Sequence, residues 1–364
     1  MSAAHGQHPA HRFRTDPATW IRDRDGRRLR TIDLHCHTIT PAVEKLVAGR
    51  PQKLAEPAVR LRTMGAASVE YNAKVMLPES IAALSDLDTR LADMDRMGVD
   101  IQVVSPLPTQ YYYWADHDLA RDIVRLQNVH IAELCARRPD RLAGLGTLAL
   151  QHPQLAVEQL EHAVNVLGLK GFELSTAVNE RELSDPLLNP VWAKAEELGA
   201  LAFIHPMGCS LGERLQASYL SNSIGQPVES AVALSQLIFG GVLDRHPGLK
   251  VCAAHGGGYL PTCIGRAEHA YHARPDAQTM AQAPSAYLKQ IFFDSLVYSS
   301  DALRQLIDHV GVGQIVVGTD YPFDMGHYDI HAIVGATPDL SDAERAAILG
   351  DTAASLLGIG PEAT

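Results

Sequence analysis

The sequence predicts an α/β fold of the (β/α)8 class, the TIM barrel, with an insertion after the first strand. Three observations lead to this prediction. The 364 residues suffice for one large barrel domain. Eight short apolar runs rich in β-branched residues are each bounded by Gly, Pro or charge, as expected of parallel strands covered on both faces. Helical stretches alternate with these runs along most of the chain.

Each predicted strand is followed by a stretch with apolar residues at helical spacing. The strands are expected at Thr31–Cys36, Asp100–Pro106, Leu142–Leu150, Lys170–Ser175, Leu201–His205, Lys250–His255, Ile291–Leu296 and Gln314–Thr319. The helices are expected at Asp86–Met97, His117–Arg137, Pro153–Leu167, Asn189–Leu198, Val228–Asp244, Tyr259–His272, Ser300–His309 and Ser341–Leu357. An open doubly wound sheet is the alternative, but no GxGxxG motif follows an early strand to support a dinucleotide-binding version.

Two segments fall outside this alternation. Residues 1–30 form a predicted N-terminal extension that is locally basic, and we expect it to be a solvated arm. Residues 31–364 form the predicted barrel domain, in which residues 38–85 are the insertion. An insertion after a barrel strand lies at the carboxyl end of the strands, where active sites form. We therefore expect the insertion to act as a lid or to line the substrate pocket.

Composition excludes several classes of protein. A formal net charge of -11 disfavours nucleic-acid binding, which requires a basic face. No apolar run approaches the ~20 residues of a membrane-spanning helix. The five cysteines are scattered without CxxC spacing or a disulfide framework, which favours a cytoplasmic location. The 46% hydrophobic fraction can fill a large core, so a mainly disordered chain is excluded.

The first, fifth and eighth predicted strands end in side chains that can bind a metal ion. His35 and His37 lie two residues apart on one strand, so both point to the same side. For this motif alone, a pair of hydrogen-bonded histidines is the alternative. His205 and Asp320 end the other two strands, and all four side chains meet at one mouth if the strands form a barrel. Such a mixed nitrogen and oxygen set suits Zn²⁺ and also Fe, Mn or Co.

His255 ends the sixth predicted strand and has a separate predicted role. Three glycines follow it, and they allow a substrate or a backbone segment to approach closely. Because histidine titrates near neutral pH, a histidine beside a metal-bound water is a suitable general base. Asp320 could in addition orient that water. The alternatives for His255 are a fifth metal ligand or a pocket wall.

Several motifs occur in combination between about Thr31 and Gly358. They are Asp33-Leu34-His35-Cys36-His37, Tyr113-Trp114-Ala115, Gly144-Leu145-Gly146-Thr147-Leu148, Ile204-His205-Pro206, Ala254-His255-Gly256-Gly257-Gly258, Gly265-Arg266 and Gly318-Thr319-Asp320-Tyr321-Pro322-Phe323. In this combination the chain resembles the amidohydrolase superfamily, in particular the branch of 2-amino-3-carboxymuconate-6-semialdehyde decarboxylase and related metal-dependent decarboxylases.

The resemblance implies roles for the residues of these motifs. The family ligands of a divalent metal, usually zinc, correspond to His35, His37, His205 and Asp320. The histidine of the HGGG motif, His255 in this chain, acts as the catalytic acid or base. Arg266, eleven residues later, matches an arginine that binds a substrate carboxylate across a dimer interface, with an ordinary helix salt bridge as the alternative. A homodimer or a higher homo-oligomer is therefore expected.

The aromatic run Tyr111–Trp114 follows the second predicted strand and is expected on a loop at the mouth. Tyr113 and Trp114 are candidate substrate contacts, because their rings can stack on a planar substrate, whereas simple loop packing is the alternative. Asp294, at the end of the seventh predicted strand, is expected either to hydrogen-bond a ligand histidine or to be a buried structural carboxylate.

Departures from the family pattern bear on the substrate. The family carries another substrate-binding arginine upstream of the first barrel helix, but Lys74–Glu79 contains no arginine, and the candidates to replace it are Lys74, Arg60 and Arg62. Met207 follows the His-Pro pair where the family tends to have Trp, and His35 stands where several hydroxybenzoate decarboxylases have Glu, which favours the semialdehyde-type branch. The predicted function is metal-dependent, non-oxidative decarboxylation of a small unsaturated or aromatic carboxylic acid. A metal-dependent hydrolase or hydratase of a ring-cleavage product or lactone is the alternative, and a non-catalytic binding barrel is a third interpretation.

Overall fold

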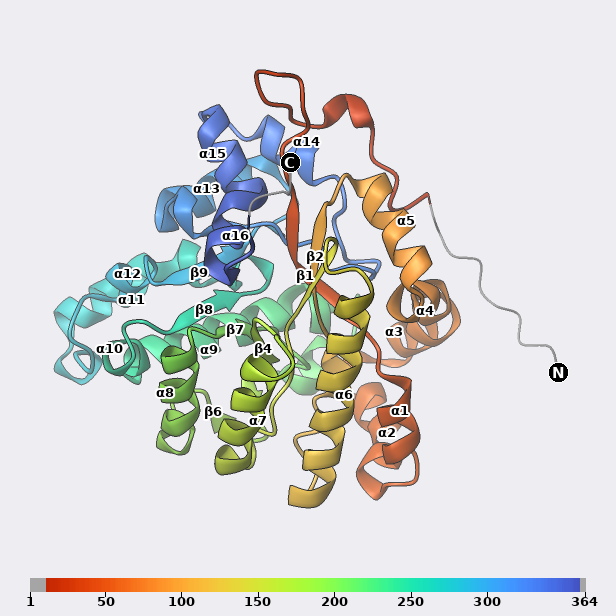
Figure 1. Cartoon of the computed structure of the whole chain (residues 1–364). Coiled ribbons are helices and arrows are strands. Elements are labelled where there is room, and N and C mark those ends of the chain that lie inside the picture. The colour runs from red at the N-terminus through yellow and green to blue at the C-terminus, as the bar shows by residue number, and fades with distance from the viewer. Residues whose placement is uncertain (1–10, 361–364) are drawn as a thin grey trace.

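Eight parallel strands form the centre of the molecule (Figure 1). The computed structural model describes residues 11–360. The strands are β1 (Ile32–Thr38), β2 (Ile101–Pro106), β3 (Leu142–Gly144), β4 (Gly171–Leu174), β7 (Leu201–Ile204), β8 (Lys250–Ala253), β9 (Ile291–Asp294) and β10 (Ile315–Val316). One parallel sheet has the order β1-β2-β3, and the other has the order β10-β9-β8-β7-β4. A separate antiparallel hairpin joins β5 (Ala177–Val178) and β6 (Arg181–Glu182).

Isolated bridges connect the edges of the two sheets. Gly146, just beyond β3, pairs with Phe172 of β4, and Asp33 of β1 pairs with Val317, just beyond β10. Each predicted strand therefore contributes residues to a parallel sheet. The predicted α/β class is confirmed, in an arrangement consistent with a TIM barrel.

The third strand is shorter than predicted. In the second half of the predicted run, the backbone hydrogen-bonds to a side chain instead of to a neighbouring strand. The predicted run Leu142–Leu150 is a strand only over Leu142–Gly144. Beyond it, the Asn128 side chain accepts a hydrogen bond from Thr147 N at 2.8 Å and donates one to Thr147 O at 3.1 Å. These bonds satisfy a buried backbone that continues as a loop.

Helices surround the two sheets. They are α5 (Leu87–Met97), α6 (His117–Arg137), α7 (Pro153–Asn165), α8 (Asn189–Leu198), α9 (Gln226–Phe239), α10 (Val242–Arg245), α11 (Leu260–Ala273), α12 (Pro284–Tyr287), α13 (Ser300–Val310), α14 (Ile330–Ala336), α15 (Asp342–Ala346) and α16 (Thr352–Leu357). The predicted helix Val228–Asp244 is divided at Gly241, whose φ of +66° lies outside the helical region. The predicted helix Ser341–Leu357 contains a π-helical turn at Ala347–Asp351.

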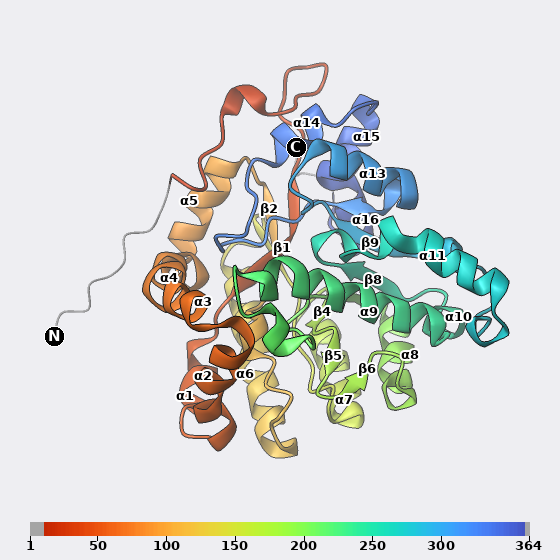
Figure 2. The same ribbon diagram turned by 180° about the vertical axis from the view of Figure 1, so that it is seen from behind.

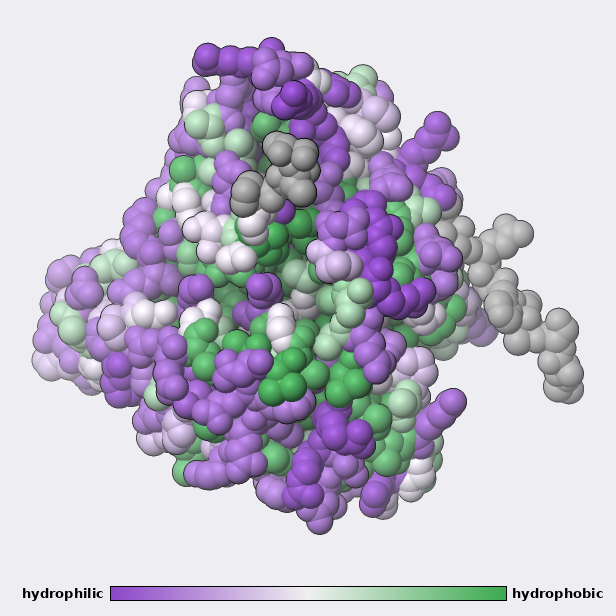
Figure 3. All heavy atoms as spheres, viewed as in Figure 1, coloured by the Kyte–Doolittle hydropathy of each residue, from purple (hydrophilic) through white to green (hydrophobic). Residues whose placement is uncertain are grey.

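The apolar core lies between the strands and the surrounding helices. Phe172, Phe203 and Phe293, from three strands, and Trp192 of α8 are all 0% exposed. Burial of each such ring contributes on the order of 2–3 kcal/mol to the free energy of unfolding. Figure 3 shows a largely hydrophilic rim, with apolar residues near the centre of this face, where Figure 1 places the strands and α16. Among residues 11–360, no helix has the length and apolar character needed to cross a membrane.

Helices occupy the region of the predicted insertion, between β1 and α5. They are α1 (Pro41–Val47), α2 (Pro51–Met64), α3 (Ala66–Tyr71), a π-helical turn (Asn72–Met76) and α4 (Leu77–Ser85). Thr38 Oγ1 donates to the Leu84 carbonyl at 2.8 Å, so α4 packs at the carboxyl end of β1. The Gln216 side chain, in the segment after β7, donates to the Arg62 carbonyl of α2 at 2.5 Å. These two segments therefore lie side by side (Figure 2).

The described part of the N-terminal extension, residues 11–30, packs against the rest of the protein. The Phe13 ring is 0% exposed, and its centroid lies 5.2 Å from that of Tyr321 and 4.7 Å from that of Tyr328. The expectation of a solvated arm is therefore wrong for this segment, because an aromatic anchor outweighs its basic composition. Residues 1–10 of the extension lie outside the described part of the chain.

Candidate metal centre

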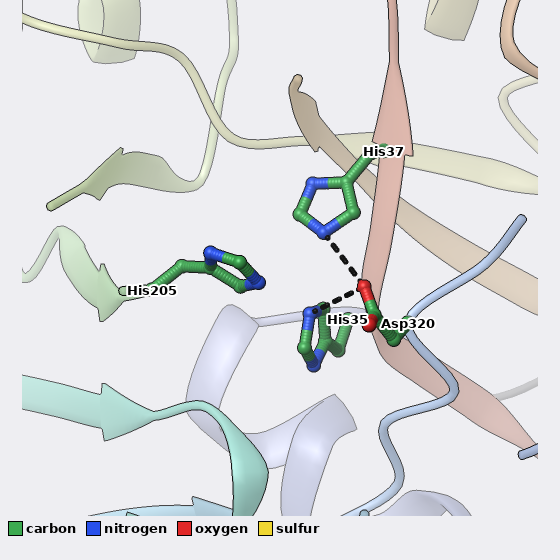
Figure 4. Close-up of side chains that lie close together, drawn as sticks. All are labelled: His35, His37, His205 and Asp320. Atoms are coloured by element: carbon green, nitrogen blue, oxygen red, sulfur yellow. Dashed lines mark ion pairs between the residues drawn. The ribbon is translucent and has the colours of Figure 1, made fainter. Parts of the chain in front are cut away.

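The four predicted ligands meet in one buried cluster (Figure 4). His35 and His37 lie on β1, His205 directly follows β7, and Asp320 follows β10. One possible ligand atom from each residue lies within 4.8 Å of those of the other three. The parallel sheets thus bring together side chains that are far apart in the sequence, at the carboxyl ends of their strands.

The alternation of β1 places both of its histidines in the cluster and Cys36 outside it. The Cys36 thiol donates instead to the Val103 carbonyl at 3.3 Å. Asp320 has a φ of +58°, in the left-handed region that Asp adopts more readily than most residues. The Asp320 N–H donates to the His35 carbonyl at 2.9 Å, which fixes this turn against β1.

The β1 histidines direct Nδ1 toward acceptors and Nε2 toward the centre of the cluster. His35 Nδ1 lies 2.7 Å from Asp294 Oδ2, and His37 Nδ1 lies 3.1 Å from the Pro106 carbonyl oxygen. Because a carbonyl can only accept, neutral His37 carries its proton on Nδ1 and presents the Nε2 lone pair to the centre. Both Nε2 atoms lie 3.3 Å from Asp320 Oδ1. This orientation is typical of histidines that bind metals.

The cluster contains buried nitrogen atoms that no described protein group satisfies. His35 Nε2, His37 Nε2 and both ring nitrogens of His205 lack a hydrogen-bond partner among residues 11–360. An unpaired buried polar atom costs about 1–3 kcal/mol. Several such atoms at one point, together with the Asp320 carboxylate, match the ligand set of divalent metals such as Zn²⁺. The residues therefore fit a divalent metal ion.

The members of the cluster shift one another's pKa values in different directions. Burial disfavours the charged form of His35, but Asp294 and Asp320 outweigh it and raise the pKa of His35 to about 10. Burial lowers the pKa of His205, and the charges of neighbouring histidines lower it further. Burial acts to raise the pKa of Asp320, yet the adjacent imidazoles of His255, His35 and His37 stabilise its charged form and hold that pKa well below its usual range. A protonated histidine thus balances the negative charge of the carboxylates in this cluster, as a bound metal ion would.

His255 lies beside the four ligands and makes longer contacts with them. Its Nε2 atom is 3.9 Å from Asp320 Oδ2, and its ring centroid is 5.2 Å from that of His35. The N–H of Gly256, the next residue, donates to Asp294 Oδ1 at 2.8 Å. Asp294 therefore fixes both His35 and the turn that carries His255. In this position His255 can exchange a proton with a molecule bound next to the ligands.

The glycines after His255 allow the close packing that the motif predicts. A Cβ atom at Gly258 would lie 2.1 Å from the Pro227 carbonyl oxygen, and one at Gly256 would lie 2.5 Å from Val297 Cγ1. The φ values of these two glycines are +64° and +60°, which glycine adopts at no steric cost. Side chains at these positions would push α9 and the segment after β9 away from the turn.

A cavity of about 500 Å³ opens beside His255 and Asp320. It is bordered by α9, α11 and α13 and by the segments after β9 and β10. Among the described residues, no Lys or Arg lines this cavity. Its polar walls include the neutral side chains of Asn222, Gln226, Tyr298 and Gln305. Its volume suits a small organic ligand.

The three predicted substrate-binding residues lie away from this cavity within one chain. The Tyr113 ring stacks on Tyr111 with centroids 5.6 Å apart, and the Trp114 ring packs against Tyr112 at 5.4 Å. Arg266 is exposed on α11 and makes no ion pair or side-chain hydrogen bond with the described residues. The structure therefore does not bring these three side chains to the predicted metal ligands of the same chain.

Glu173 is a site residue that the sequence did not single out. It lies on β4, is 0% exposed, and its Oε2 atom is 3.4 Å from His37 Nδ1. The Tyr111 hydroxyl donates to Glu173 Oε1 at 2.5 Å. Glu173 therefore connects the aromatic run after β2 to His37, a predicted metal ligand. A single acidic residue inside an otherwise apolar strand was the only signal in the sequence.

Comparisons with known proteins agree with this geometry. A curated 2-amino-3-carboxymuconate-6-semialdehyde decarboxylase from Dictyostelium discoideum is 37% identical over 278 residues, which cover 76% of this chain and 77% of that protein. The crystal structure of 5-carboxyvanillate decarboxylase from Sphingomonas paucimobilis has a TM-score of 0.79 and 25% identity, and covers 91% of this chain and 100% of that chain.

A third comparison concerns the fold alone. A 5-carboxyvanillate decarboxylase from Novosphingobium aromaticivorans, solved with bound manganese, has a TM-score of 0.80 at 21% identity and covers 91% of this chain and 97% of that chain. The family model described as Amidohydrolase matches residues 32–359. The resemblance inferred from the motifs is thereby confirmed, and the chain belongs to the amidohydrolase family.

Proposed function

We propose that this protein is a metal-dependent decarboxylase, a carboxy-lyase that releases CO₂ without oxidation from a small unsaturated or aromatic carboxylic acid. The observation that carries the proposal is the position of His255, on the wall of the cavity and 3.9 Å from a carboxylate of the ligand cluster. The names of the relatives support the same reaction class. Carboxymuconate-semialdehyde-like and hydroxybenzoate-like acids are the candidate substrates.

The proposed metal is Zn²⁺, with Mn²⁺ or Fe²⁺ as the alternatives, held by His35, His37, His205 and Asp320. Three imidazoles and one carboxylate suit Zn²⁺, and the manganese bound to a structural neighbour supports the alternative. When bound, a divalent ion supplies positive charge that binds substrate oxygens and stabilises negative charge in the transition state.

The protein's own groups handle the proton of the reaction. The bond between the carboxyl carbon and its neighbouring carbon breaks, its electron pair stays on that neighbouring carbon, and the carboxyl group leaves as CO₂. The neighbouring carbon then needs one proton, and His255 Nε2 is placed to hold and deliver it. Asp320, 3.9 Å away, orients the protonated imidazole as well as serving as a ligand.

The proposed architecture is a closed (β/α)8 barrel of residues 31–364, with the N-terminal extension 1–30 and the insertion 38–85. The bridges at both edges of the two sheets support closure. The exposed, unpaired Arg266 supports the proposal that it binds a substrate carboxylate in the partner subunit of a homodimer or higher homo-oligomer. The substrate contacts expected of Tyr113 and Trp114 stay predictions. The free state of all five cysteines supports a cytoplasmic location.

A CO₂-release screen of the metal-loaded protein tests the proposed function. The panel contains muconate semialdehydes, salicylates, catechol carboxylates and 5-carboxyvanillate. The expected result is release of CO₂ from at least one acid, lost on removal of the metal. Metal-dependent opening of a lactone, without CO₂ release from any acid, would overturn the proposal in favour of a hydrolase or hydratase.

A further inference from the structure

Arg90 is a buried cation on α5, the helix that precedes β2. It is 1% exposed, and it has no ion-pair partner among residues 11–360. Its guanidinium donates instead to neutral acceptors. Nη1 donates to Gln102 Oε1 at 2.8 Å, and Nη2 donates to the carbonyl oxygens of His37 at 2.5 Å and of Ala83 at 3.2 Å. Because burial of a charge without a paired anion is costly, these hydrogen bonds must hold Arg90 in the core.

The amide of Gln102 connects Arg90 to the carboxylate of Asp33. Gln102 lies on β2 and is 0% exposed, and its Nε2 atom donates to Asp33 Oδ2 at 3.1 Å. Because a guanidinium can only donate, Gln102 Oε1 faces Arg90 and Nε2 faces the carboxylate. A buried cation, an amide and a buried carboxylate thus form one connected network, in which the two charges offset each other.

Asp33 joins β1 to the segment after β10, which carries Asp320. These two parts of the chain are paired by isolated bridges instead of a continuous ladder. Asp33 Oδ1 accepts from the N–H of His35 at 3.2 Å and from the N–H of Thr319 at 3.1 Å, and Oδ2 accepts from Thr319 Oγ1 at 2.7 Å. Thr319 directly precedes Asp320. The carboxylate therefore fixes the backbone next to predicted ligands on both sides of this junction.

Arg90 also contacts both sides of this junction directly. On the β1 side it holds the carbonyl of His37. On the other side its Cζ atom lies 4.9 Å from the centroid of the Tyr321 ring, and Tyr321 directly follows Asp320. Figure 4 shows Asp320 facing both β1 histidines from that segment, and its Oδ1 atom is 3.3 Å from each Nε2 atom. The contacts of Arg90 therefore end beside three of the four predicted ligands, whereas His205, after β7, stands outside the junction.

We propose that Arg90 is a positioning residue of the metal centre. Through Gln102 and Asp33 it sets the separation between the β1 histidines and the carboxylate that faces them. This inference rests on the metal site of the proposed function and deepens it. Arg90 suits this role because the planar guanidinium donates to an amide and to two backbone carbonyls in a fixed geometry. A lysine ammonium keeps the charge but cannot reproduce that planar fork.

Titration of the metal-free full chain with Co²⁺ tests this role, because the visible absorption bands of bound Co²⁺ report the arrangement of its ligands. In R90K the charge remains while the fork is lost. Its affinity for Co²⁺ should fall about tenfold to a hundredfold, the range for groups that orient metal ligands, and its absorption bands should shift. A fall in Tm with wild-type affinity and an unchanged spectrum would show that Arg90 only stabilises the fold, and would overturn the inference.

R141K is the matched control. Arg141 also donates to two backbone carbonyls, of Asp100 at 2.8 Å and of Val99 at 3.1 Å. These contacts lie at the amino end of β2, opposite the end at which the predicted ligands meet. R141K should therefore keep the Co²⁺ affinity and the spectrum of the wild type. Equal changes in R141K and R90K would show a general effect of losing a guanidinium, and would overturn the inference.

Q102M tests the route from Arg90 to Asp33. It keeps the length of the side chain and removes the amide that joins the two charged groups. Q102M should shift the Co²⁺ bands in the same direction as R90K, and it decides the question alone if R90K does not fold. A Q102M protein with the wild-type spectrum and affinity would overturn the route through Gln102 and with it the inference.

The metal measurements do not depend on turnover. If R90K and Q102M change the binding and the spectrum of Co²⁺ while no acid releases CO₂, the inference stands and the decarboxylase proposal fails. If the wild type releases CO₂ and both variants match it in Co²⁺ affinity and spectrum, the decarboxylase proposal stands and the positioning role of Arg90 fails.

Discussion

The metal cluster and the cavity beside it are built from different parts of the fold. The cluster stands at strand ends, and its two β1 histidines are oriented by other buried groups, as Asp294 Oδ2 orients His35 Nδ1 at 2.7 Å. The cavity is lined by residues of α9, α11 and α13 and by segments between elements, where Tyr298 is 48% exposed and has a φ of +65°. Groups that need fixed geometry thus stand on the strands of the core, whereas the cavity wall stands outside the strands, on residues that can vary without disturbing them.

A substitution in the cluster should have the largest effect. Asp320→Asn removes the carboxylate that contacts both β1 histidines at 3.3 Å. We expect metal content, measured by mass spectrometry, to fall, and CO₂ release to fall on the order of a thousandfold, because a bound metal contributes several kcal/mol to transition-state stabilisation. Tyr298→Phe, in the cavity wall, should cost only severalfold. Similar losses in the two variants would contradict the division between cluster and cavity.

Removing the support behind a ligand should have the next largest effect. Asp294→Asn weakens the contacts with His35 Nδ1 and with the Gly256 N–H. Metal affinity should fall by up to about a hundredfold, the upper end of the range for groups that orient metal ligands. Asp301→Asn, an exposed substitution at the start of α13, is the control and should leave affinity unchanged. Equal metal affinities for the two variants would show that Asp294 does not orient His35.

The metal affinity of the cluster should also depend on pH. Despite its burial, His35 has a pKa raised to about 10 by Asp294 and Asp320. Metal binding must displace that proton, so affinity should increase with pH, about tenfold per unit for each displaced proton, up to about pH 10. Zn²⁺ titrations between about pH 6 and pH 8 check this slope. A metal affinity that does not change with pH would show that metal binding displaces no proton from His35.

Among the substitutions in or next to the metal cluster, Glu173→Gln should have the smallest effect on metal affinity. Its contact with His37 Nδ1 is longer, at 3.4 Å, and the Pro106 carbonyl at 3.1 Å also orients that ring. Metal affinity should fall by about tenfold or less. A loss as large as that of Asp294→Asn would show that Glu173, rather than the backbone carbonyl, fixes His37.

The sequence predicted the parts of the site that stand on the core better than those around it. His35, His37, His205 and Asp320 interrupt or end apolar runs, and period-two alternation gives their direction. Glu173 was not predicted as a site residue, because a single acidic residue in a strand, without a motif around it, does not indicate which side chains it contacts.

The segments outside the strands were harder to predict for a different physical reason. Phe13 lies in an arginine-rich segment whose composition is typical of a solvated arm, and its burial depends on packing against Tyr321 and Tyr328, more than 300 positions away. The loop after β2 illustrates the same limit, because the sequence places Tyr113 and Trp114 at the mouth but cannot say that their rings pack on neighbouring tyrosines.

The most direct test of the account is the rate of CO₂ release by His255→Asn loaded with metal. We expect this variant to keep the metal content and ligand affinity of the wild type, because His255 stands beside the four ligands. Its rate should fall about 10²- to 10⁴-fold, the usual contribution of a general acid. A metal-loaded His255→Asn protein that releases CO₂ at the wild-type rate would contradict the central claim.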